Sequence, residues 1–348
     1  MVTSGLEAER RSPGIAMITP AEDVRYSIVV PIYNEEAVLP LLLRRLDALM
    51  DGLDGPAEAI LVDDGSIDTS SIVLAAKAKY DPRYRYVGLT RNFGHQVAIT
   101  AGMDVAAGAA IIVMDADLQD PPEVVGAMIA RWKEGFDIVY AKRLSREGES
   151  TFKRWTAGLF YRLLGRLTAI EIPSDVGDFR LIDRRVLEAF QAMPERDRFV
   201  RGMFAWLGFR QTEVGFHRPP RAAGNTKYPF WKMLGLAVNG VLGFSDAPLR
   251  LAIWLGLAVS AFAVVYGAYA IGLRIFGGDV VTGWTSIIVV VSLLCGVNML
   301  MTGIMGLYVG RIHAEVKRRP LYVVGKRVGF ERAEAAAQLP ARRTARQG

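Results

Sequence analysis

The chain contains very little cysteine and histidine. Its 348 residues include one cysteine and three histidines. A single thiol excludes a disulfide framework and a cysteine-rich metal site, and no two histidines have the spacing of zinc ligands. Cys295 lies in an apolar run, where packing is its ordinary role. The chemistry of the chain must therefore rest on other side chains.

The chain also lacks a basic surface spread along its length. The net charge is +6, but residues 311–348 alone hold ten Lys or Arg against three Asp or Glu. This basic segment follows an apolar one, so it suits the cytoplasmic flank of a membrane anchor better than a nucleic-acid surface. We expect no nucleic-acid partner. Residues 1–25 have no apolar core, so we predict a disordered leader and no signal peptide.

From Tyr26 onward, short β-branched runs alternate with segments of helical spacing. The runs in YSIVVPIYNEE, AEAILVDDGS, RYRYVGLT and AAIIVMDAD are typical of strands. The alternation predicts an α/β domain over residues 26–228, with a parallel sheet covered by helices on both faces. Ligands bind such sheets beyond the carboxyl ends of the strands. The polar clusters YNEE, DDGS and DADLQ all fall at those ends.

Two long uncharged segments, 251–273 and 284–310, follow this domain. Each is long enough to cross a hydrocarbon core of roughly 30 Å, so we predict two transmembrane helices within residues 249–311. Basic residues flank their outer ends, which places both termini in the cytoplasm, with a basic tail over residues 312–348. The segments at 152–168 and 228–244 are amphipathic. They read either as core helices or as helices lying on a membrane surface, the second forming a juxtamembrane helix at 229–248.

Three acids crowd the end of the fourth predicted strand, in MDADLQDPPE. A capping loop would explain them, because Asp and Pro favour turns. However, Asp115 and Asp117 are two residues apart, so an extended chain points them the same way, and Gln119 adds a neutral oxygen in phase. Oxygen ligands suit Mg²⁺ or Mn²⁺ with positions left for phosphate oxygens. The stretch therefore predicts a metal that carries a diphosphate.

The other strand ends suit a nucleotide. Asp63 and Asp64 precede Gly65 and have the oxygens to accept from a base N–H or from ribose hydroxyls. Pro31, Tyr33 and Glu35 follow the first strand and are placed to form a floor beside them. Each cluster alone also reads as an acidic strand-end turn. Together the clusters favour a nucleotide diphosphate as ligand.

The ordered motifs IVVPIYNEE, LVDDGSIDTS, RNFGHQVAITAG, MDADLQDPPE, DVGDFRLIDR and AGNTKYP resemble the family 2 glycosyltransferases of GT-A fold. The chain looks most like the membrane-anchored polyprenyl-phosphate glycosyltransferases, the bacterial relatives of dolichyl-phosphate mannose synthase. The resemblance runs from about residue 26 to 310. It implies a GT-A catalytic domain with a Rossmann-like, mostly parallel sheet, followed by interfacial helices and two transmembrane helices. It also implies sugar transfer from a nucleotide diphosphate to a lipid phosphate at the cytoplasmic membrane face.

The resemblance also assigns roles to individual residues. It implies a uridine nucleotide donor, a polyprenyl phosphate acceptor and a homo-oligomer (dimer or tetramer). The metal would be bound by Asp115, Asp117 and Gln119, and the nucleotide by Pro31, Tyr33, Glu35, Asp63 and Asp64. The acceptor phosphate and the diphosphate would be bound by Arg143, Arg154, Arg221 and Lys227, and Asp178 would be the acid beside the acceptor. A lipid phosphate is mostly a dianion at pH 7 and needs little deprotonation. We therefore expect Asp178 to orient the acceptor or the sugar rather than act as an obligatory base.

Two other interpretations remain. A processive polysaccharide synthase would share the nucleotide half, but it needs more membrane helices and a Gln-x-x-Arg-Trp motif, where this chain has Thr151 in place of the Gln. A non-catalytic membrane scaffold would have no reason to carry a full set of metal and phosphate ligands. Absence of sugar-nucleotide binding or turnover would favour the scaffold.

Overall fold

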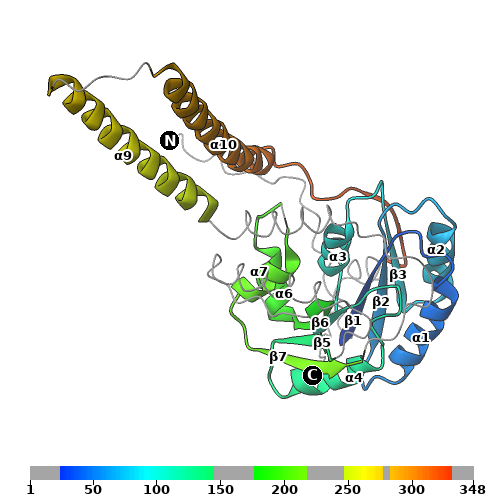
Figure 1. The fold of residues 1–348 in the computed structure, drawn as a ribbon. Coiled ribbons are helices and arrows are strands. Elements are labelled where there is room, and N and C mark those ends of the chain that lie inside the picture. Colours follow the sequence, from blue (N-terminus) through cyan, green and yellow to red (C-terminus); the bar gives the residue numbers. More distant parts are fainter. Residues whose placement is uncertain (1–23, 145–175, 197, 218–246, 277–282, 331–348) are drawn as a thin grey trace, which may run out of the picture.

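The computed structural model describes residues 24–144, 176–196, 198–217, 247–276 and 283–330. An α/β domain lies at one end and two long helices extend away from it (Figure 1). The elements, in chain order, are β1 (Tyr26–Ile32), α1 (Leu39–Asp51), β2 (Ala57–Asp63), α2 (Ser70–Tyr80), β3 (Tyr84–Leu89), α3 (His95–Asp104), β4 (Ala110–Val113), α4 (Val124–Lys133), β5 (Ile138–Arg143), β6 (Val176–Asp183), α6 (Arg184–Gln191), α7 (Val200–Trp206), β7 (Gln211–Phe216), α9 (Ala247–Ile275), α10 (Trp284–Val316) and β8 (Val324–Val328).

The described strands form one mixed sheet in the order β7-β5-β6-β4-β1-β2-β3-β8. Strands β4, β1, β2 and β3 are parallel to their neighbours in that run, whereas β6 is antiparallel to both β4 and β5, and β8 is antiparallel to β3. The chain leaves β1 towards β2 and later returns on the other side of β1 as β4. Parallel sheets bind ligands at such a switch in strand order. The predicted α/β class with a mostly parallel sheet is confirmed.

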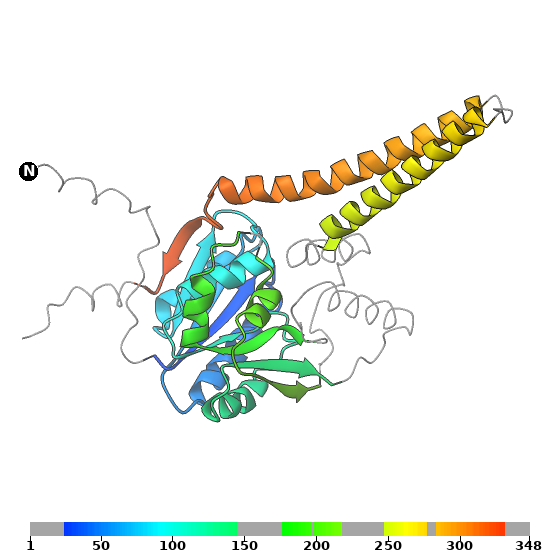
Figure 2. The same ribbon diagram turned by 90° about the vertical axis from the view of Figure 1, so that its left-hand side faces the viewer.

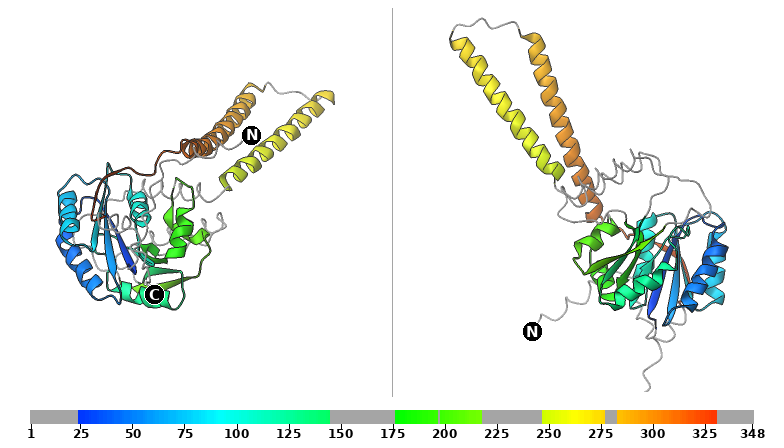
Figure 3. Two further views of the ribbon diagram at one scale, coloured as in Figure 1. Left: turned by 180° about the vertical axis from the view of Figure 1, so that it is seen from behind. Right: turned by 60° about the horizontal axis from the view of Figure 1, so that its bottom comes forward.

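Two apolar layers hold helices against the two faces of the sheet. Helices α1, α2 and α4 pack on one face, and α3, α6 and α7 pack on the other (Figure 3). Helix α1 shows why: Leu39, Leu42, Leu46 and Met50 recur at helical spacing and are all buried. That spacing places them in one stripe facing the sheet. The prediction of helices on both faces is therefore confirmed.

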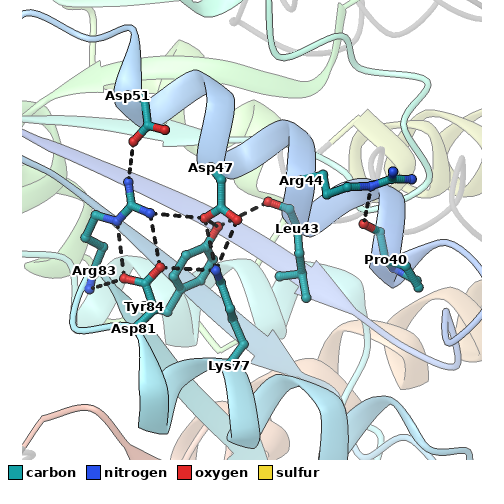
Figure 4. A network of polar contacts seen from close by, with 9 residues as sticks. All are labelled: Pro40, Leu43, Arg44, Asp47, Asp51, Lys77, Asp81, Arg83 and Tyr84. Atoms are coloured by element: carbon teal, nitrogen blue, oxygen red, sulfur yellow. Dashed lines mark hydrogen bonds and ion pairs between the residues drawn. The ribbon is translucent and has the colours of Figure 1, made fainter.

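A network of charged side chains joins α1 to α2 at the edge of the domain (Figure 4). The Arg83 guanidinium donates to Asp47, Asp51 and Asp81, and the Lys77 ammonium donates to Asp47 and Asp81. The pKa of Asp81 is about 2, because hydrogen bonds from Arg83 and Lys77 outweigh the effect of its burial. The network is partly exposed, so water screens these ion pairs and each contributes little to stability.

Helices α9 and α10 lie side by side as an antiparallel pair that projects from the α/β domain (Figures 1 and 2). They contain 29 and 33 residues, which at about 1.5 Å per residue is enough to cross a bilayer. Their apolar windows, Ala252–Tyr269 and Leu293–Val316, are not buried within the chain. By length and composition, both helices meet the requirements of a membrane span.

The chain after α10 returns to the α/β domain. The sequence alone predicted a basic tail over residues 312–348; of these, residues 312–316 complete α10 and Val324–Val328 add strand β8 to the sheet beside β3. The Tyr322 hydroxyl donates to Asp104 at 2.8 Å, and Phe330 is buried in the layer of α3, α6 and α7. The last strand of the sheet thus follows the two long helices in the chain.

Candidate active site

Asp115 and Asp117 lie just beyond the carboxyl end of β4, as predicted. The backbone N–H of Met114 still donates to Val29 of β1, and the chain then leaves the sheet. One oxygen of Asp115 (Oδ1) is buried and accepts no hydrogen bond among the described residues. A buried carboxylate oxygen without a donor is costly unless something positive faces it. Asp115 Oδ1 therefore requires a positively charged group nearby.

The loop after β4 is held in a tight conformation by its own acids. The backbone N–H of Gln119 donates to Asp117 Oδ1 at 3.0 Å, and that of Asp115 donates to Asp120 Oδ2 at 3.2 Å. Leu118 has a φ of 59°, a conformation that costs a non-glycine residue of order 1 kcal/mol or more. Burial and the charge of Asp115 raise the pKa of Asp120 to about 7. Such stored strain and crowding of carboxyl groups is typical of a binding site.

Asp178 reaches the same edge of the sheet from β6. Strand β6 is antiparallel to β4, with Arg180 opposite Val113. Asp115, two residues after Val113, therefore lies at the same edge as Asp178, two residues before Arg180. His95, the first residue of α3, lies between them, with Nε2 3.3 Å from Asp115 Oδ1 and 3.3 Å from Asp178 Oδ2. Three elements separated in sequence therefore place two acids and a histidine in one cluster.

The Asp178 carboxylate is almost fully occupied by donors. Arg201 donates from Nε at 2.9 Å and from Nη2 at 3.0 Å, and Gln96 Nε2 donates at 3.1 Å. The buried Arg180 guanidinium lies 3.4 Å away. Burial acts to raise the pKa of Asp178, but the hydrogen bond from His95 and the charge of Arg201 hold it well below its usual range. A carboxylate so stabilised is a poor proton acceptor at neutral pH.

His95 carries a positive charge in this cluster. Partial loss of solvent around the ring lowers its pKa, but the hydrogen bond to Asp178 and the charges of Asp115 and Asp178 outweigh it and raise the pKa to about 9. A histidine at the start of a helix can be satisfied by backbone groups alone. The structure instead pairs its ring with two carboxylates.

The acids at the end of β2 organise two loops. Asp64 accepts the backbone N–H groups of Phe93 at 2.7 Å and Gly94 at 2.9 Å, which fixes the loop that leads into His95. Asp63 accepts from the backbone of Ser66 at 2.8 Å and from the Tyr86 hydroxyl at 3.0 Å. Both carboxylates therefore have structural partners, but carboxylate oxygens have lone pairs left for a ligand.

A cavity of about 670 Å³ opens beside Asp63. Gly65, with a φ of 70°, forms part of its wall, and a Cβ at this position would lie 2.4 Å from the backbone of Arg91. Only glycine lets the two loops approach this closely. The lining residues are Tyr33, Asp63, Gly65, Ser66, Ile67, Ser71, Ile72, Tyr86, Gly88, Leu89, Thr90, Arg91, Asn92, Gly325 and Lys326.

The remaining predicted residues fall in three groups. Pro31 is buried in β1, beyond the last residue of β1 that pairs with β4. Its lack of a backbone N–H therefore removes no hydrogen bond between these two strands. Glu35 is half-buried in the turn that follows β1. Arg143 ends β5 against Gly177, where a Cβ would lie 3.0 Å from its Nη2, and its buried Nε has no hydrogen-bond partner among the described residues. Arg154, Arg221 and Lys227 lie outside the described residues.

Comparison with known proteins identifies the family. The family model described as "Glycosyl transferase family 2" matches residues 27–190. An uncharacterized glycosyltransferase of Bacillus subtilis, YkcC, is 48% identical over 88% of this chain and 95% of its own length. The chain belongs to glycosyl transferase family 2. A protein of Escherichia coli named as a prophage bactoprenol glucosyl transferase homolog is 39% identical to this family 2 member over 88% of the chain and 99% of its own length.

Solved structures resemble this family 2 chain more distantly. Glucosyl-3-phosphoglycerate synthase of Mycobacterium tuberculosis is 22% identical, with a TM-score of 0.43 over 64% of this chain and 81% of its own.

The donor set at the end of β4 fits a metal held jointly with substrate. In the described ranges, no three His, Cys, Asp or Glu side chains are arranged to hold an ion by themselves. Magnesium is commonly bound by one or two carboxylates together with substrate phosphates. The unsatisfied Asp115 oxygen and the neighbouring Asp117 meet that requirement. In this family 2 chain, Asp115 and Asp117 would hold the ion only when a diphosphate supplies further oxygens.

Sequence reasoning missed the donors around Asp178. From the sequence alone, Arg201 could lie near the acceptor or equally well face solvent, and no role was indicated for Gln96 or Arg180. These residues lie on α3, β6 and α7 and meet only through the fold. Residue spacing carries no signal for such a meeting. The one usable sign was the placement of Asp178 and Arg180 in a short polar strand, DVGDFR.

We expect Asp178→Asn to reduce glycosyl transfer by no more than about tenfold. Asparagine keeps the shape and one oxygen that can accept from Arg201, whereas its amide nitrogen cannot replace the second acceptor and its neutral charge weakens the contact with His95. A general base contributes about 10²- to 10⁴-fold, so a loss in that range would reject a positioning role. Initial rates between pH 6 and 9 provide the check, because loss of a base also changes the pH profile.

Proposed function

We propose that this chain transfers a sugar, with inversion, from a UDP-sugar to a polyprenyl phosphate at the cytoplasmic face of a membrane. The observation that carries the proposal is that one chain joins an acidic, nucleotide-sized site to two helices long enough to span a bilayer. The relative named as a bactoprenol glucosyl transferase homolog, matched over nearly its full length, supports the lipid acceptor.

The donor would lie along the carboxyl edge of β1, β2 and β4. The nucleoside would enter the cavity lined by Tyr33 and Asp63, and the diphosphate would extend towards Asp115 and Asp117. Mg²⁺ or Mn²⁺, held by these acids with Gln119, would stabilise the negative charge that grows on the departing diphosphate. The ordered turn at Gly65 and the loop fixed by Asp64 keep the site shaped before the donor arrives.

The acceptor would approach from the side of β5 and β6. A lipid phosphate is already mostly dianionic, so it needs positioning and charge compensation more than deprotonation. Of the four cations proposed to bind phosphate, Arg143 lies within the described residues, and Arg154, Arg221 and Lys227 complete the set. Arginine holds phosphate through a fixed pair of N–H donors. Asp178, with its low pKa, would keep Arg201 and His95 in place while the phosphate oxygen attacks the anomeric carbon in line.

The membrane arrangement follows from charge. Arg250 precedes the apolar window of α9, and Lys317, Arg318 and Arg319 follow α10, so positive residues gather at the ends nearest the α/β domain. By the positive-inside rule the domain and both termini face the cytoplasm. The glycines along α10 suit close helix packing, and we include a homo-oligomer, a dimer or tetramer, in the proposal.

The test uses the purified full chain in detergent with undecaprenyl phosphate, Mg²⁺ or Mn²⁺, and a panel of radiolabelled UDP- and GDP-sugars. We expect one UDP-sugar to give a labelled lipid, and EDTA to abolish its formation. A long polymer from the same donor would instead indicate a processive synthase. Binding of no sugar nucleotide would favour a scaffold, and donor hydrolysis without labelled lipid would contradict the proposed acceptor.

A further inference from the structure

Strand β8 forms one wall of the donor cavity. Gly325 and Lys326 line the cavity together with Tyr33, Asp63 and residues of the β3–α3 loop. The strand is fixed in place, because the Thr90 N–H donates to the Val323 carbonyl at 3.0 Å and β8 pairs with β3 from Tyr86 to Leu89. A segment that follows the long helices is thus built into the nucleotide site (Figure 2, red strand).

The register of the sheet places Lys326 across from Asp63. Asp63 of β2 pairs with Gly88 of β3, and Gly88 pairs with Lys326 of β8. Residues paired in this way point to the same face of a sheet, and strands lie about 4.8 Å apart. Asp63 and Lys326 therefore rise from the same face with two strand spacings, about 10 Å, between their backbones.

The packing of the neighbouring residues confirms which face Lys326 occupies. Val328, two residues along β8, packs against the apolar layer that contains Tyr86. Arg327, between them, points to the other face, where its guanidinium lies 5.8 Å from the Phe330 ring centroid. Alternation along a strand then puts Lys326 on the side of Tyr86 and Asp63.

Gly88 lies between Asp63 and Lys326 in the sheet, and the Tyr86 ring covers it. A Cβ at Gly88 would lie 2.5 Å from the Tyr86 hydroxyl, so only glycine lets the ring cross this position and form the floor between the two side chains. The floor is fixed, because the same hydroxyl donates to Asp63. A pyrimidine ring lying over Tyr86 would have the Asp63 carboxylate on one side and the Lys326 ammonium on the other.

We infer that Lys326 binds the nucleobase of the donor by donating a hydrogen bond to a keto oxygen. The ammonium offers three donors, is exposed, and has no hydrogen bond or ion pair within the described part of the chain. Uracil presents an N–H between two keto oxygens. Asp63 on one side suits the N–H, and Lys326 on the other suits a keto oxygen. This inference rests on the proposed function, since it assigns a residue to the nucleotide-binding part of the same site.

The experiment measures UDP binding to the purified full chain by calorimetry, with Lys326→Met, Lys326→Arg and Arg327→Met. Methionine keeps the apolar stem and removes the charge, and Arg327→Met removes the same charge one residue away on the opposite face. We expect Lys326→Met to raise the Kd for UDP about tenfold or more, Lys326→Arg to recover part of the affinity, and Arg327→Met to change it less than about twofold. Thermal unfolding of each variant checks that the fold is retained.

Uridine, measured by competition with UDP, distinguishes the base from the phosphates. An equal loss of affinity for uridine and UDP in Lys326→Met supports the base contact, whereas a loss for UDP alone overturns it. Wild-type binding of UDP with no effect of Lys326→Met overturns the inference and leaves the proposed function standing. Wild-type protein that binds no uridine nucleotide overturns both.

Discussion

Replacing Asp117 with alanine should lower sugar transfer by about three orders of magnitude, equivalent to roughly 4 kcal/mol of transition-state stabilisation. Asp117 follows Asp115, whose Oδ1 is buried without a hydrogen bond and faces the His95 ring at 3.3 Å, so the two acids together carry more negative charge than His95 alone balances. Removing one of the two proposed carboxylate ligands would leave the departing diphosphate with less of its counter-charge. Initial rates of lipid labelling at saturating donor provide the measurement.

The Asp117→Asn variant distinguishes a role in metal binding from a role in holding the loop after β4. The Asp117 side chain also accepts the backbone N–H of Gln119, and asparagine can still accept that hydrogen bond. If the charge matters, asparagine should be nearly as inactive as alanine, and high concentrations of Mn²⁺ should restore part of its rate. Near-normal transfer by the asparagine variant would assign Asp117 to loop geometry alone. Asp51→Ala, an exposed acid on α1, is the control that should leave the rate unchanged.

Replacing Glu58 with alanine should lower the free energy of unfolding of the α/β domain by about 3–5 kcal/mol. Glu58 is 3% exposed, and its Oε2 lies 2.7 Å from Nε of the buried Arg85. Its Oε1 accepts the Ser27 hydroxyl at 2.6 Å and the Ala107 N–H at 2.8 Å. Alanine would leave all three donors, including a buried positive charge, without an acceptor.

The effect should appear as a fall in the unfolding temperature of roughly 6–20 °C, read from tryptophan fluorescence in detergent. Arg83→Ala is the matched control, because it breaks several ion pairs at the surface and should cost about 1 kcal/mol or less. Glu58 lies near the amino end of β2, far along the strand from Asp63, so transfer per folded molecule should be unchanged. Equal destabilisation by both variants would contradict the assignment of buried charge as the cause.

The sequence was most informative about the strands and the polar residues that directly follow them. Each strand preceding a polar cluster was visible as a β-branched run, so the residue pattern alone was enough to place Asp63 and Asp115 at one edge of the sheet. The sheet class followed from the same alternation. These features depend on residues close together in the chain, where periodicity carries the signal.

The features that the sequence did not reveal depend on contacts between distant segments. The five residues of β8 include two adjacent basic residues, Lys326 and Arg327, so they read as part of a charged tail. Their pairing with β3 makes them a strand. An edge strand of a sheet tolerates such exposed charged side chains. The hydrogen-bond partners of Asp64 and Asp178 were equally invisible, since these donors come from loops and helices that only the fold brings near.

The position of β8 in the chain has a consequence for biosynthesis. Ribosomes make the amino-terminal strands first, and domains begin to fold as they emerge. Here the strand carrying Lys326 is translated only after both long helices, so a nascent chain cannot close its donor cavity while those helices are still being made. Under the proposed function, the nucleotide site is therefore completed only after the two proposed membrane helices have been made.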